Sequence, residues 1–172
     1  MNGALLLLPI ILIRYGLLFV LDKESLKRAA FFPPLAGRER VAYWVYQAST
    51  LLLIAWLFFL RVTAGTPWFY ARLAVYCLGV LLCFISTLNY AKPSANGINL
   101  KGLYRLSRNP MYVAYFICFL GCAWLTMSLV LLAMLIVFQI AAHWIILSEE
   151  RWCKAQFGDA YIQYMKKVRR YI

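Results

Sequence analysis

The sequence predicts an all-α integral membrane protein with about five transmembrane helices. Hydrophobic residues make up 65% of its 172 residues and the mean hydropathy is +0.73, whereas about half of the residues in soluble domains are apolar. The apolar residues form five runs, and basic residues gather in alternate connections between them. These runs leave too little chain for a separate soluble domain, so we expect one membrane domain over residues 1–172.

The five apolar runs cover Gly3–Leu21, Val41–Leu60, Phe69–Tyr90, Met111–Thr126 and Ser128–Leu147. An α-helix needs about 20 apolar residues to cross the hydrocarbon core of a bilayer. The fourth run is short, and we expect it to tilt or to rely on interfacial anchors. The first run does not resemble a signal peptide, because no basic residue precedes it and Arg14 interrupts its centre.

The basic residues predict the orientation of these spans. The four connections carry five, two, four and no Lys or Arg residues in chain order, and the C-terminal tail carries six. Because basic loops stay in the cytosol, we expect the N-terminus outside and the C-terminus in the cytosol. Residues 1–91 then hold three spans. Residues 92–172 hold a basic cytosolic loop, a helical hairpin and a cytosolic tail.

The charge and the cysteines exclude two other classes of function. The net charge is +12, but the basic residues lie between apolar runs and form no aromatic-interleaved patch, so we expect no nucleic-acid partner. The five cysteines are odd in number, lack CxxC spacing and fall mostly inside apolar runs. They are typical of membrane packing, and we expect no metal site.

Some polar residues lie where a bilayer should exclude them. Arg14 is expected to face the bundle interior, either in a structural pair or toward a cavity or headgroup. In the last span Gln139, His143 and Glu150 lie within roughly 40° of one line on a helix, which predicts a polar stripe toward the cytosol. Glu149 points about 100° away from Glu150, so the two acids are expected to have different roles.

The segment before the fourth span predicts a ligand site. Pro110 is expected to open that helix with Asn109 as its N-cap. The free N–H groups of the helix N-terminus suit a carboxylate or phosphate, and Tyr104 and Tyr112 are placed to flank an aromatic ligand. The two adjacent acids after the last span either serve this ligand or are solvated where the span ends.

These motifs resemble those of integral-membrane methyltransferases, which include isoprenylcysteine carboxyl methyltransferases, phospholipid N-methyltransferases and many small bacterial relatives. The resemblance covers roughly Asn96 to Arg170. It rests on three groups of residues: Gly102, Tyr104, Arg108, Asn109, Pro110 and Tyr112; then Glu149 and Glu150; then Phe157, Gly158, Tyr161 and Tyr164.

The resemblance implies S-adenosylmethionine as cofactor and methyl transfer as activity. Carried over by position, it implies a cofactor site formed by Asn96, Gly97, Ile98, Asn99, Tyr104, Asn109, Pro110, Met111, Tyr112 and Glu149. The sequence also departs from the carboxyl methyltransferases. Those tend to have His at the positions of Asn96 and Asn109, and an Arg at the position of Ile145. The missing Arg puts carboxylate methylation in doubt.

We therefore expect a multi-pass membrane enzyme, in the cytoplasmic membrane if the source is prokaryotic. The cofactor enters from the cytosol and a lipophilic acceptor arrives from the bilayer. Glu149 or Glu150 would hold the amino group or ribose of the cofactor, and Arg108 or the helix N-terminus its carboxylate. His143 or Glu150 would take a proton from an amine or thiol acceptor. We expect Glu150, His143 and Arg108 to be the catalytic residues.

Two alternatives to this function remain. One is an NADPH-dependent membrane reductase of the sterol-reductase type, and the other is a non-catalytic scaffold or lipid-binding protein. The acceptor is also open among a prenylated cysteine, an amine headgroup, a thiol and an isoprenoid lipid.

Overall fold

The structure is a computed structural model that describes residues 1–21, 23–92 and 97–172. These residues are mostly helical, and no strand occurs among them. The elements are η1 (Gly3–Leu6), α1 (Leu7–Ile11), the π-helix η2 (Leu12–Leu17), α2 (Leu18–Leu21), α3 (Lys23–Ala30), α4 (Glu39–Phe59), α5 (Phe69–Ala91), η3 (Gly102–Arg105), α6 (Pro110–Thr126) and α7 (Leu129–Lys167).

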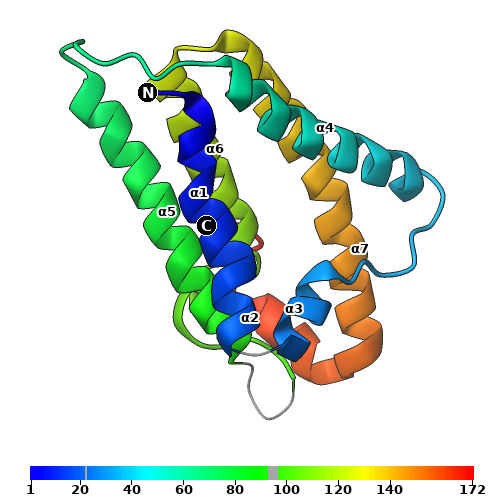
Figure 1. Ribbon diagram of the computed structural model, residues 1–172. Helices are drawn as coiled ribbons and strands as arrows, with labels where there is room; N and C mark the ends of the chain where they lie inside the picture. The colour runs from blue at the N-terminus through cyan, green and yellow to red at the C-terminus, as the bar shows by residue number, and fades with distance from the viewer. Residues whose placement is uncertain (22, 93–96) are drawn as a thin grey trace.

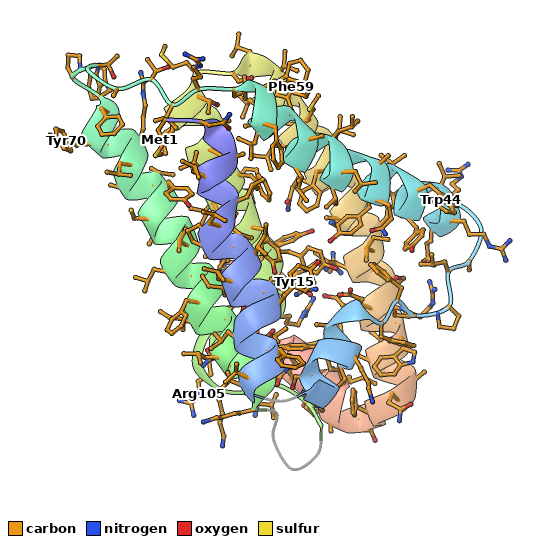
Figure 2. All side chains as sticks on the ribbon, viewed as in Figure 1. Met1, Tyr15, Trp44, Phe59, Tyr70 and Arg105 are labelled. Carbon is orange, nitrogen blue, oxygen red and sulfur yellow. The ribbon has the colours of Figure 1, made fainter. Side chains whose placement is uncertain are left out.

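All five predicted apolar runs are helical. Four helices among the described residues are long and apolar enough to cross a membrane: the first helix (Gly3–Leu21, formed by η1 to α2), α4, α5 and α7. The fourth run became α6, which has 17 residues and is shorter than the others. Aromatic side chains such as Trp44, Phe59 and Tyr70 point outward from the bundle, as expected of surfaces that face lipid (Figure 2).

The first helix, α5 and α6 run side by side (Figure 1), and small residues let α5 and α6 approach closely. A Cβ atom at Gly121 would lie 2.5 Å from the Cα atom of Tyr76, and one at Gly79 would clash with the backbone of Cys118. Cys118 and Cys122 are buried free thiols in this core. These buried cysteines therefore contribute to packing, as predicted, whereas Cys77 is exposed.

A second pair is formed by α4 and α7. The rings of Tyr46 and Phe138 stack between them with centroids 5.1 Å apart. At the start of α4, Glu39 forms a bidentate ion pair with Arg151 on α7. At the other end, the backbone N–H of Gly3 donates to the carbonyl of Leu60 at 2.8 Å, which joins this pair to the first helix.

The last helix is much longer than the apolar run that predicted it. It does not end near Leu147: the helix continues to Phe157, which corresponds to about 44 Å and is longer than a hydrocarbon core is thick, and helical residues then follow to Lys167. Gly158, with φ 53° and ψ −133°, breaks the helical geometry. The kink turns the end of the helix back under the bundle (Figure 1).

Candidate functional site

A cavity of about 550 Å³ lies between the two groups of helices, at the end where the segments expected in the cytosol gather. Its volume is in the range of sites for small organic ligands. Most of the predicted cofactor residues line it: Gly97, Ile98, Asn99, Tyr104, Asn109, Met111, Tyr112 and Glu149. Pro110 is not among its lining residues, and Asn96 lies outside the described residues.

The loop before α6 is fixed by contacts with α5 and with the end of α7. Gly102 has φ 58°, and a Cβ atom there would clash with the side chain of Asn89, whose Oδ1 accepts from Leu103 N at 2.9 Å. The Tyr164 hydroxyl donates to the carbonyl of Tyr104 at 2.6 Å. Burial raises the pKa of Tyr104 well above its usual value, so its phenol stays protonated at the cavity wall.

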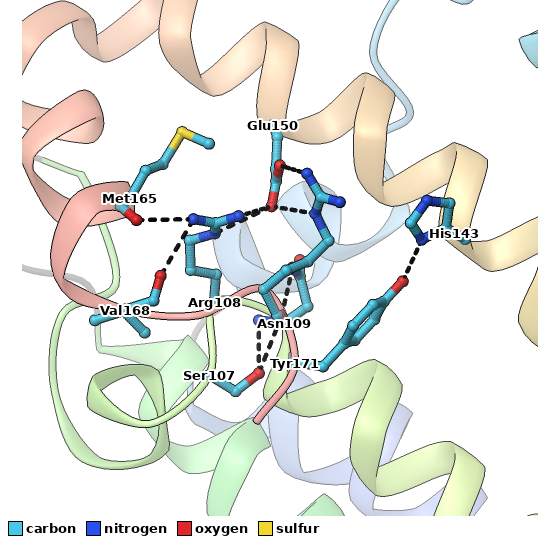
Figure 3. Close-up of polar contacts among 9 residues, drawn as sticks. Ser107, Arg108, Asn109, His143, Glu150, Met165, Val168 and Tyr171 are labelled. Carbon is cyan, nitrogen blue, oxygen red and sulfur yellow. Dashed lines mark hydrogen bonds and ion pairs between the residues drawn. The ribbon is translucent and has the colours of Figure 1, made fainter.

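Arg108 and Glu150 form the centre of a buried ion cluster (Figure 3). Arg108 donates to Glu150 Oε1 from Nη2 at 2.8 Å and from Nε at 3.1 Å, and its Nη1 donates to the carbonyls of Met165 and Val168. Arg170 donates to the same carboxylate at 2.9 and 3.1 Å. Two of the three predicted catalytic residues are therefore bound to each other and to the C-terminal tail.

The tail after α7 lies against the start of α6. The backbone N–H of Arg108 donates to the carbonyl of Arg169 at 2.9 Å, and the Asn109 side chain donates to that of Arg170 at 3.1 Å. His143, the third predicted catalytic residue, has its Nδ1 2.7 Å from the hydroxyl of Tyr171. It is not among the residues that line the cavity. Because His143 and Glu150 contact consecutive tail residues, they share a face of α7 as predicted.

The start of α6 agrees with the prediction in position but not in capping. Pro110 is the first residue of the helix and Asn109 precedes it. The Asn109 side chain makes no capping hydrogen bond, because it binds the tail instead.

Glu149 has surroundings different from those of Glu150. Its Oε1 accepts from the Tyr112 hydroxyl at 2.8 Å, and its side chain lines the cavity. Glu149 and Glu150 therefore have different partners, and that they have different roles stays a prediction. Across the described part of the chain, Asn99 Oδ1 is one of a few buried polar atoms without a hydrogen-bond partner, and it too belongs to a cavity-lining residue. The cavity thus offers a carboxylate and an amide oxygen to a ligand.

Arg14 reaches the cavity from the first helix, so the expectation that it faces the bundle interior is confirmed. Its Nη2 donates to the carbonyl of Ala29 at 2.8 Å, and its guanidinium lies 5.9 Å from the centroid of the Tyr115 ring. The cavity also has aromatic walls that the sequence did not single out. These are Phe31, Phe32, Tyr46, Tyr90, Tyr115 and Trp152.

Comparison with known proteins identifies a family for the chain. No curated protein and no solved structure gives a significant match to the chain. A family described as phospholipid methyltransferase matches residues 75–160, which is half of the chain and includes the loop before α6, α6 and both acids of α7. The chain therefore belongs to the phospholipid methyltransferase family, whose members are membrane methyltransferases.

Proposed function

We propose that this protein transfers a methyl group from S-adenosylmethionine to a lipophilic acceptor, with the cofactor bound in the 550 Å³ cavity. The observation that carries the proposal is the position of Glu149 in the wall of that cavity. Within the described part of the chain, its carboxylate accepts a hydrogen bond from one side chain, that of Tyr112. The family match supports the same reaction class.

The lining residues fit the cofactor. Glu149 and the unpartnered Oδ1 of Asn99 suit the amino group and hydroxyls of the cofactor. The aromatic side chains Trp152 and Phe157 suit a purine ring. Lys27 and Arg28 bring positive charge to the same wall, which suits a carboxylate.

When bound, the cofactor supplies an activated methyl group. The protein residues align it with the acceptor and exclude water from the cavity. Arg108 and Glu150 act as positioning residues in this proposal, because their charged groups are bound to each other and to the tail. They hold the loop that carries Tyr104 and Asn109 in place. His143 supports the same tail through Tyr171.

Calorimetric titration of S-adenosylmethionine into the purified full-length protein tests the proposal. We expect binding in the wild type and an affinity at least about tenfold lower in Glu149→Gln, because the amide cannot attract the ammonium group as a carboxylate does. Asp159→Asn, the same change at an exposed position on α7, should bind as the wild type does.

Two outcomes of this titration would contradict the proposal. Equal affinity in the wild type and Glu149→Gln would remove Glu149 from the site. Binding of NADPH in place of S-adenosylmethionine would favour a reductase.

A further inference from the structure

Arg14 lies inside the first helix, where a charged side chain is costly unless it has a role in the bundle. The helix is not regular there. Residues Leu12–Leu17 form a π-helix, whose extra residue per turn changes the direction of the side chains that follow. Such segments occur often at functional sites. A charge and a π-helix at one position in a membrane span indicate a specific role for Arg14.

The contacts of Arg14 do not neutralise its charge. The guanidinium donates to one backbone carbonyl, that of Ala29, and lies over the Tyr115 ring. Within the described part of the chain, no carboxylate lies within ion-pair distance of it. Of the two acids that share its cavity, Glu149 binds Tyr112, and Glu150 binds Arg108 and Arg170. Arg14 therefore presents a half-buried positive charge with donors to spare to the cavity.

Arg14 and Glu149 mark different depths of the cavity. Tyr112 on α6 binds Glu149, and Tyr115, about 4.5 Å farther along the same helix, lies against Arg14. Because α6 begins at the end expected in the cytosol, the partner of Arg14 on that helix lies about one turn farther from this end than the partner of Glu149. The cavity thus has a negative group that contacts the beginning of α6 and a positive group that contacts its next turn.

We propose that Arg14 binds an anionic group of the lipid acceptor, a phosphate or a carboxylate, and so determines which lipids are methylated. This inference rests on the proposed function. A guanidinium forms two parallel hydrogen bonds with either group, and the low dielectric of a membrane cavity strengthens them.

The inference is tested by lipid binding to the full-length protein in an uncharged detergent, followed by native mass spectrometry. The probes are two matched pairs: dioleoylphosphatidic acid with dioleoylglycerol, and S-farnesyl-N-acetylcysteine with its methyl ester. We expect the wild type to prefer at least one anionic probe over its neutral partner by about tenfold or more. Excess inorganic phosphate should not displace the lipid.

The Arg14 variants distinguish this role from others. Arg14→Gln should lose the preference, while Arg14→Lys should keep a weaker one because an ammonium lacks the planar fork. Arg40→Gln, at an exposed position on α4, serves as the matched control and should behave as the wild type. Thermal unfolding of each variant checks that it is folded.

Three results distinguish lipid binding by Arg14 from cofactor binding by Arg14, and both from a failure of the proposed function. An unchanged preference in folded Arg14→Gln would overturn the inference. A loss of S-adenosylmethionine affinity in that variant, with the lipid preference intact, would also overturn it and assign Arg14 to the carboxylate of the cofactor. If the wild type binds no S-adenosylmethionine but shows an Arg14-dependent lipid preference, the proposed function fails and the anionic-lipid site stands.

Discussion

Replacing Arg108 with Met should destabilise the protein strongly, because it breaks the buried cluster that joins α6, α7 and the tail. The side chains of Arg108 and Glu150 are 8% and 4% exposed. Removing one partner of such a pair costs about 3–5 kcal/mol, because the other charge stays buried. The carbonyls of Met165 and Val168 also lose a donor, at about 1 kcal/mol each. Arg170 still neutralises Glu150, so we expect a net loss of about 3 kcal/mol.

Denaturant titration in detergent micelles measures this loss as a change in the free energy of unfolding. Arg151→Met is the matched control, because its ion pair with Glu39 also joins two elements but the Arg151 side chain is 50% exposed. We expect its effect to be much smaller. The double variant Arg108→Met with Glu150→Gln should be less destabilised than the sum of the single variants by about 1 kcal/mol or more.

A loss in Arg108→Met no larger than in Arg151→Met would refute this reasoning. Additive single variants, with a coupling energy below about 0.5 kcal/mol, would refute it as well. Either result would mean that the cluster does not hold the tail, and Arg108 would again be a candidate for direct ligand contact.

Three other changes test the packing and the site. Gly121→Val should disrupt the α5–α6 crossing and lower the yield of folded protein, whereas Gly16→Ala, with open space around it, should be tolerated; equal yields would contradict the close approach. Tyr164→Phe removes the hydrogen bond to the carbonyl of Tyr104 and should cost about 1 kcal/mol in the same titration, and a stability equal to the wild type would show the bond to be dispensable. Deletion of residues 168–172 should leave membrane insertion intact but expose the loop before α6 to proteolysis, because Arg170 and Tyr171 no longer cover Glu150 and His143; an unchanged cleavage pattern would contradict the role of the tail.

The helices could be predicted from the sequence because each depends on local properties. Runs of apolar residues predicted the positions of the four long helices and of the shorter α6, and Pro110 predicted the start of α6. Helical periodicity separated Glu149 from Glu150 and placed Glu150 with His143. Arg14 could be expected to point inward, because a charge facing lipid is unfavourable.

Contacts between distant segments could not be predicted in this way. The period of a helix shows which residues share a face, but it does not show what that face touches. Arg170 was counted only as one of six basic residues in a cytosolic tail, although it completes the ion cluster with Glu150. The extension of α7 beyond Leu147 was missed because charged residues end an apolar run without ending a helix. Tyr46 and Tyr115 entered the site only through tertiary packing.

The two helix pairs that enclose the cavity are tied to each other. The α5–α6 pair is locked by its glycine crossing, and the α4–α7 pair is locked by the Glu39–Arg151 ion pair and the stacked rings of Tyr46 and Phe138. The cavity takes its walls from both pairs, and the bonds from Tyr112 to Glu149 and from Arg108 to Glu150 join α6 to α7 across it. Sliding one pair against the other would break these bonds. The width of the cavity is therefore coupled to the hydrogen bonds of both acids.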